Sequence, residues 1–165
     1  MIRTIMIALC LCIIEFLVIV IASPMANPAL VLRFLPKDVR EAAKDHPAPP
    51  VYKQVIAHIL LAVFLISMFA GIINVGIYGI RNGFSYGQLS AHFIVFLYVI
   101  KAFDIIVQDQ WLVMTLGYFK KVFPETSECE GWKDRGFNNK NQIVRIVAYP
   151  FLAMITAGVF MLFSK

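Results

Sequence analysis

The chain has 165 residues, of which 60% are hydrophobic and only 15% charged, and its mean hydropathy is +0.77. Soluble domains contain about 45–50% apolar residues, so this composition excludes an ordinary soluble fold. The formal net charge of +5 does not indicate a nucleic-acid partner, because the Lys and Arg residues are not gathered on one soluble face. We therefore expect a single integral membrane domain over residues 1–165.

Four apolar segments are long enough to cross a bilayer as helices, which need about 20 residues and satisfy their own backbone hydrogen bonds. The predicted spans cover residues 5–22, 55–80, 89–116 and 146–163. The predicted fold class is all-α, a four-helix transmembrane bundle with one short interfacial amphipathic helix.

The first apolar segment also has an alternative interpretation as a cleaved signal peptide. Arg3 precedes it, and the small residues Ala22 and Ala26 follow it. Its length, the presence of Glu15 within it and Pro24 near the candidate cleavage site favour a retained span.

The short interfacial helix is expected between residues 35 and 45, opened by Pro36 and ended by the proline-rich residues 46–50. Its apolar side would contain Leu35, Val39, Ala42 and Ala43, opposite a charged side.

The Asn82-Gly83 pair predicts a tight turn between the second and third spans. Small residues at helical spacing predict close helix packing at Ser67, Gly71 and Gly79, and at Ala153 and Ala157.

Lys and Arg are distributed unequally between the two sides of the predicted bundle. The loops at 23–54 and 117–145 carry eleven of them, whereas Arg3, Arg81 and Lys165 are the three on the other side. By the positive-inside rule, both long loops are expected in the cytoplasm and both termini outside.

Ionisable residues within the spans are candidate functional residues, because charge is costly in lipid. An α-helical third span places Tyr98, Lys101, Asp104, Gln108, Trp111 and Thr115 on one polar stripe, with Asp109 off it on the Lys101 side. The ligand or ion candidates are Glu15, Lys101, Asp104, Gln108, Asp109 and Trp111. Glu15 of the first span would lie at the depth of Lys101 and pair with it, with Asp104 as the competing partner. This polar seam would bind a ligand, pass a proton or hold a cation; alternatively, Lys101 extends to the interface.

No catalytic signature or metal-ligand spacing is present in the sequence. Three scattered cysteines indicate neither a disulfide framework nor a zinc site, so no metal or cofactor is predicted. The polar segment 123–142 contains Trp132 and Phe137. It is expected either to be a solvated loop whose aromatic residues contact the interface, or to be a lid or docking segment.

The run from Phe103 to Trp111, followed by Phe123-Pro124-Glu125-Thr126, resembles a family of uncharacterised bacterial four-span membrane proteins. These show a Phe-Asp…Asp-Trp segment on the third span and a Pro-Gly-Thr-Glu-like loop. Here Gln110 separates the Asp from the Trp, the glycine is lacking, and Asn138-Asn139 stands where a His is expected. The resemblance implies a bacterial inner-membrane location and no specific activity.

These observations favour a non-enzymatic binding or accessory component of the inner membrane. One alternative is an oligomeric small transporter or channel subunit that uses the Glu15, Lys101 and Asp104 seam. The other is a membrane-embedded enzyme acting on a lipid. The expected partners are membrane lipids and either a second copy of the chain or another membrane protein.

Overall fold

The computed structural model describes residues 1–163 and is 79% helical, with no strand among those residues. Within them, four helices are long and apolar enough to cross a membrane. They are α1 (Ile2–Ala22), α4 (Val51–Arg81), the continuous helix formed by α5 (Tyr86–Phe103) and η1 (Asp104–Thr115), and α7 (Asn139–Leu162). The predicted all-α four-helix bundle is confirmed.

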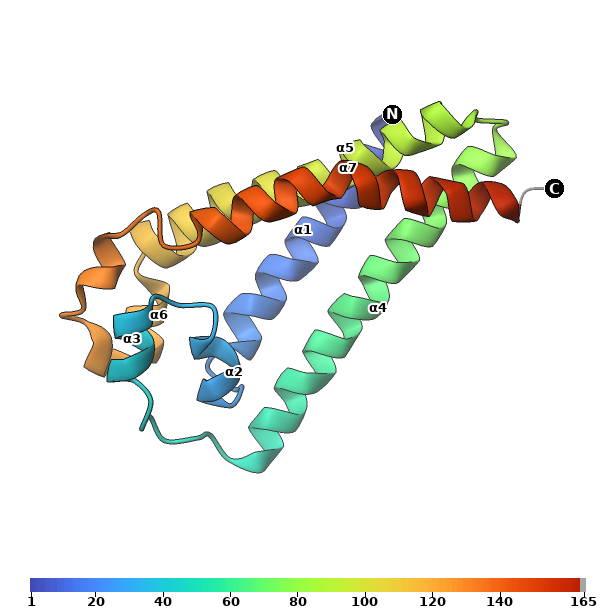
Figure 1. Cartoon of the computed structure of the whole chain (residues 1–165). Coiled ribbons are helices and arrows are strands. Elements are labelled where there is room, and N and C mark those ends of the chain that lie inside the picture. Colours follow the sequence, from blue (N-terminus) through green and yellow to red (C-terminus); the bar gives the residue numbers. More distant parts are fainter. Residues whose placement is uncertain (164–165) are drawn as a thin grey trace.

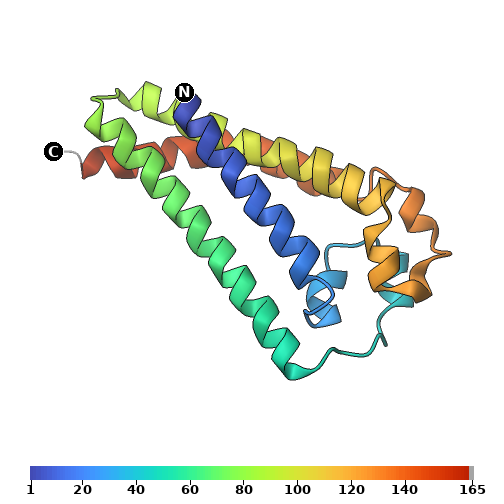
Figure 2. The ribbon, with the colours of Figure 1, turned by 180° about the vertical axis from the view of Figure 1, so that it is seen from behind.

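The helix α1 lies between α4 on one side and the neighbouring pair α5 and α7 on the other (Figures 1 and 2). The buried residues where these helices meet are Ala8, Leu11, Val75, Leu89, Phe93, Phe96, Ala153 and Ala157. The predicted turn joins α4 to α5, with Gly83 at a positive φ of 66° that favours glycine. A capping box of Ser85 and Gln88 then starts α5.

Small residues allow the helices to approach closely. A Cβ on Gly71 would lie 2.7 Å from Leu11 Cδ1, and one on Gly76 would lie 2.3 Å from the Phe160 ring. On α7, Ala153 and Ala157 are fully buried. The predicted close packing is therefore confirmed at Gly71 and Gly79 and at Ala153 and Ala157, with Gly76 as an additional contact. Ser67 is only half-buried, and its hydroxyl donates to the Val63 carbonyl of its own helix.

The first half of α4 diverges from the other spans (Figures 1 and 2). Apart from Ala57, the buried residues of α4 begin at Gly71. The bundle is thus closed where the glycines lie and more open at the other end, which carries the short helices.

That end is covered by a folded unit, here called the cap, made of residues 23–50 and 116–138. It contains α2 (Pro28–Leu32), α3 (Lys37–Ala42), α6 (Tyr118–Val122), η2 (Pro124–Thr126) and η3 (Glu130–Lys133). The cap has its own apolar core of Leu32, Leu35, Val39, Ala43, Phe119, Phe123 and Trp132, together with Val113 of η1.

Hydrogen bonds join the two parts of the cap. The Gly131 N–H donates to Asp38 Oδ2 at 2.7 Å, and His46 Nδ1 lies 2.7 Å from Glu125 Oε1. The Tyr118 hydroxyl donates to the Val20 carbonyl at 2.6 Å, which attaches the cap to α1. We call the end of the bundle under the cap the loop end.

The cap corrects two expectations from the sequence. The predicted interfacial helix is only the six residues of α3, it follows an unexpected α2, and Ala42 on its supposed apolar side is exposed. Trp132 does not lie at the interface, because it is buried and its Nε1 donates to the Thr126 carbonyl at 2.7 Å. Burial of this indole in the cap core satisfies both its apolar ring and its N–H.

Candidate functional site

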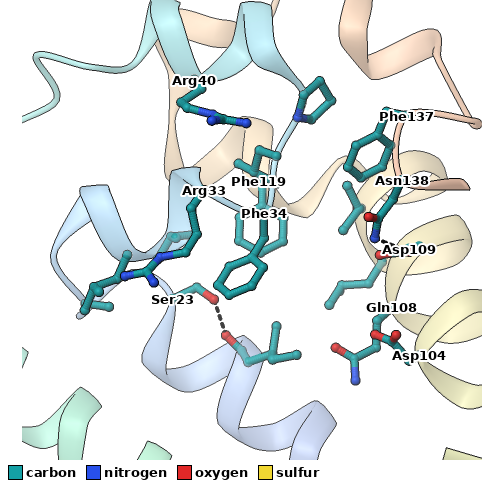
Figure 3. A pocket seen from close by; sticks show the side chains of 18 of the residues that line it. Ser23, Arg33, Phe34, Arg40, Asp104, Gln108, Asp109, Phe119, Phe137 and Asn138 are labelled. Atoms are coloured by element: carbon teal, nitrogen blue, oxygen red, sulfur yellow. Dashed lines mark hydrogen bonds between the residues drawn. The ribbon is translucent and has the colours of Figure 1, made fainter. Parts of the chain in front are cut away.

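A cavity of about 1090 Å³ lies at the loop end, between α1, the first half of α4, η1 and the cap. Its volume slightly exceeds that of ordinary ligand pockets, which is about 300–1,000 Å³. Leu61 of α4 lines the cavity and is 46% exposed, whereas Ala57 of the same helix, also in the lining, is 4% exposed. Figure 3 shows the cavity from close by.

Most of the cavity wall is apolar. Helix α1 contributes Val18 and Ile19, α4 contributes Leu61 and Phe64, and η1 contributes Leu112. The cap adds Phe34 and Phe119. In Figure 3 these two rings lie between the arginines on one side and Asp104, Gln108 and Asp109 on the other. Such a wall accommodates hydrocarbon and offers it no polar partner.

The polar floor of the cavity, defined as Glu15, Asp104, Gln108 and Asp109, comes from α1 and η1. η1 is a π-helix of 12 residues, in which backbone hydrogen bonds join residues five apart. A π-helix has more residues per turn than an α-helix, so residues four and five apart share a face. Asp104, Gln108 and Asp109 therefore all line the cavity, although an α-helix would turn Asp109 away.

Lys101 pairs with Asp104 and not with Glu15. Its Nζ donates to Asp104 Oδ2 one turn along the same chain segment, and Lys101 is only 2% exposed. Within residues 1–163 no ion pair joins Lys101 to Glu15, which corrects the predicted interhelical pair. The burial of Lys101 also excludes the alternative in which its side chain extends to the interface.

Glu15 remains without an ionic partner of its own, although Asp104 and Lys101 are within electrostatic range and the Gln108 amide is close to it. Its Oε2 atom is buried without a hydrogen-bond partner among the described residues. The same is true of Nε2 of Gln108, a side chain that is only 4% exposed. The floor thus contains an acceptor and a donor that interact with each other only weakly, because neither Glu15 Oε2 nor Gln108 Nε2 makes a hydrogen bond of ordinary length to a described residue.

Asp109 is held by two amides from the segment that starts α7. Asn138 Nδ2 donates to its Oδ2 at 3.2 Å, and Gln142 Nε2 donates to the same atom at 2.5 Å. Asp109 is one of the candidate residues predicted from the sequence, although an α-helix puts it off the polar stripe, whereas Asn138 is not among the candidates. Their contact depends on the π-helix, for which the sequence contains no recognised signal.

The cavity lining also contains four cationic side chains, here called the rim. Arg33, Lys37 and Arg40 come from the cap, and Arg145 comes from α7. Arg33 and Arg40 lie across the cavity from Asp104, Gln108 and Asp109 (Figure 3). These cations entered the sequence analysis only as evidence for membrane orientation, because nothing in the sequence brings α2 and α3 over the third span.

The predicted residue Trp111 lies outside the cavity. It is 46% exposed and its ring lies 6.3 Å from that of Phe16. The change from α- to π-helix at Asp104 explains this position, because the angular offset from the start of the stripe accumulates along η1.

The histidines of the spans have separate roles. The buried His92 has its Nδ1 2.6 Å from Thr4 Oγ1, near the opposite end of the bundle. His58 lines the cavity, and its Nδ1 donates to the Gln54 carbonyl at 2.6 Å. Within residues 1–163, no three His, Cys, Asp or Glu side chains are arranged to hold a metal ion.

Comparisons with known protein families, with curated proteins and with solved structures found no match to this chain. The resemblance to bacterial four-span proteins therefore stays a prediction. Interpretation of the site depends on its geometry and chemistry.

Proposed function

We propose that the protein is a non-enzymatic binding component of a membrane, and that it holds a lipid-like amphiphile in the cavity at the loop end. The observation that carries the proposal is the combination of an apolar wall, a polar floor and the exposed Leu61 on a membrane-spanning helix. An amphiphile places hydrocarbon against Val18, Leu61 and Phe64 and its polar group against the floor. A lipid chain that moves from the bilayer to this wall gains little hydrophobic free energy, because the bilayer interior is equally apolar, so contacts of the polar group with the floor determine which lipid is held.

The proposed location is the bacterial inner membrane, with the cap in the cytoplasm and both termini outside. The eleven Lys and Arg residues of the two loops support this orientation. The ligand would then enter from the cytoplasmic leaflet.

The direct test is the amount of lipid that remains with the purified protein. We expect native mass spectrometry of detergent-purified protein to show one lipid bound per chain. Ala57→Phe places a ring at a buried position of the cavity wall and is expected to lower the bound fraction at least about fivefold, since overpacking costs about 1–3 kcal/mol.

The matched control is Ala62→Phe, which makes the same change at an exposed position on α4 outside the cavity lining. It should retain the wild-type amount of lipid. Thermal melting of both variants checks that they are folded. Equal lipid retention by folded Ala57→Phe and Ala62→Phe would contradict the proposal.

A second candidate function is an enzyme acting on a lipid, and the observation that favours it is the unpartnered Glu15 carboxylate in a cavity with an apolar wall. Such a group is suited to act as a general base. Mass analysis of the co-purified lipid before and after prolonged incubation separates the candidates, because binding alone leaves the lipid mass unchanged.

The transporter alternative is less favoured. It requires Lys101 in the polar seam, but Lys101 pairs with Asp104 and is not among the residues that line the cavity.

A further inference from the structure

Two atoms in the floor identify the chemistry of the ligand more closely. Glu15 Oε2 is a buried acceptor and Gln108 Nε2 is a buried donor, and neither has a hydrogen-bond partner within residues 1–163. Both side chains line the cavity, and the Gln108 amide interacts weakly with the Glu15 carboxylate at a contact longer than an ordinary hydrogen bond. A hydroxyl placed between them can replace this weak contact by two full hydrogen bonds. A buried polar atom without a partner costs about 1–3 kcal/mol, so a ligand that satisfies both atoms recovers that free energy.

We infer that the cavity selects a neutral lipid whose polar group carries a free hydroxyl, an inference that rests on the proposed function. A single hydroxyl donates its hydrogen to Glu15 Oε2 and accepts one from Gln108 Nε2. The attached hydrocarbon then lies against the neighbouring side chains of Val18, Leu61 and Phe64.

The other polar groups of membrane lipids fit the floor less well. An ammonium group donates to Glu15 but leaves Gln108 Nε2 without an acceptor. A phosphate or carboxylate accepts from Gln108 but faces the carboxylates of Glu15 and Asp109. The whole cavity lining contains six carboxylates and four Lys or Arg side chains, so its charge does not favour an anion.

The test compares four probes that share one C18 chain: 1-oleoylglycerol, methyl oleate, oleylamine and oleate. Each is added at equal concentration to delipidated protein in detergent, and the bound fraction is measured by native mass spectrometry. Wild-type protein should bind 1-oleoylglycerol about tenfold more tightly than methyl oleate, the effect of one or two net hydrogen bonds.

Gln108→Met removes the donor and should reduce this preference to about twofold or less. Gln110→Met is the control, because it makes the same change in η1 at a residue outside the cavity lining, and it should keep the preference. Glu15→Met gives an independent variant that removes the acceptor and should likewise abolish the preference. Melting temperatures establish that the variants are folded.

Equal binding of 1-oleoylglycerol and methyl oleate by the wild type would overturn the inference and leave the proposed function standing. Preference for oleylamine would indicate a cation site at Glu15, and preference for oleate would indicate an anion site at the rim; either result overturns the inference. A hydroxyl preference that persists in folded Gln108→Met would also contradict it. If no probe and no endogenous lipid binds, the proposed function itself fails.

Discussion

At the residue scale, the sequence indicated which side chains are unusual but not how they pair. Lys101 and Asp104 are three residues apart on one helix, so they are neighbours whatever the positions of the other spans in the membrane. Glu15 lies on another helix, and its predicted pairing with Lys101 rests on their matching depth, their opposite charges and the cost of an unpaired charge in lipid. The residue types of the floor were predictable because charge is rare in spans, whereas the positions of Asp109 and Trp111 depended on the π-helix.

We predict that Lys101 and Asp104 are strongly coupled. Lys101→Met leaves the Asp104 carboxylate without its partner and is expected to cost about 3–5 kcal/mol. The double variant Lys101→Met with Asp104→Asn should be more stable than the sum of the single effects predicts, by at least about 1 kcal/mol. The measurement is a thermal or denaturant melt in detergent.

The control for this cycle pairs Lys101→Met with Glu15→Gln. Since no ion pair joins Lys101 to Glu15, the two effects should be closer to additive. A larger coupling of Lys101 to Glu15 than to Asp104 would show that the pairing described here is wrong.

A second residue-scale prediction concerns Cys129 in the cap. Burial, and then the nearby Asp38 carboxylate, raise the pKa of its thiol. The folded state therefore favours the neutral thiol. This contribution to stability is complete below the ordinary thiol pKa and is lost as pH rises through the raised pKa.

In a chain with Cys10 and Cys12 replaced by Ala, alkylation of Cys129 should reach half its maximal rate at a higher pH in folded protein than in protein unfolded in SDS. Asp38→Asn removes the neighbouring charge and should shift this midpoint to lower pH. Identical midpoints in the folded and unfolded chains would contradict the raised pKa.

At the element scale, hydropathy identified all four spans but not the full helices. α4 begins at Val51 and α7 at Asn139, before the predicted spans at 55 and 146, because these helices continue with polar residues beyond the lipid. The cap was largely missed. Its helices are five or six residues long, and they are stabilised by contacts between segments about ninety residues apart, such as Asp38 with Gly131.

This contact leads to a prediction about the cap. A Cβ on Gly131 would lie 2.1 Å from Asp38 Oδ1 and 2.6 Å from Pro36 Cβ. Gly131→Ala should therefore separate α3 from η3 and lower stability by about 1–3 kcal/mol. Limited proteolysis should then cut the cap faster, and the melting temperature in detergent should fall.

Gly87→Ala is the matched control, because a Cβ there meets no atom within 4 Å. It lies in α5 and should leave stability unchanged or raise it by up to about 1 kcal/mol. If Gly131→Ala, like this control, melts at the wild-type temperature, the close packing of η3 on α3 described here is contradicted.

At the scale of the whole molecule, the cap and the divergence of α4 leave a cavity at one end of the four-helix bundle. α1 is central to this arrangement, since it contacts both α4 and α5 and supplies Glu15 and Val18 to the cavity. A mature chain without α1 would lose the bundle core at Ala8 and Leu11. We therefore predict that membrane-purified protein has an intact mass that includes α1, and a start between residues 23 and 27 would contradict this.

The proposed orientation is tested by fusions at both termini. Alkaline phosphatase should be active at each end and a fluorescent protein that folds only in the cytoplasm should be dark, because the eleven Lys and Arg residues keep the two loops inside. The opposite result at both ends would show that the protein has the inverted orientation, with both termini in the cytoplasm. Different results at the two ends would indicate an odd number of spans.

The central claim is that a lipid occupies the cavity at the loop end, and photo-cross-linking in membranes tests it most directly. A lipid with a photoreactive group in its chain is activated in membranes that contain the protein, and the labelled peptides are mapped. The account predicts that label is concentrated on residues 15–22, 57–64 and 104–113, which surround the cavity. Label confined to exposed lipid-facing residues such as Ile143, Val147 and Ile155, with none on the cavity segments, would contradict it.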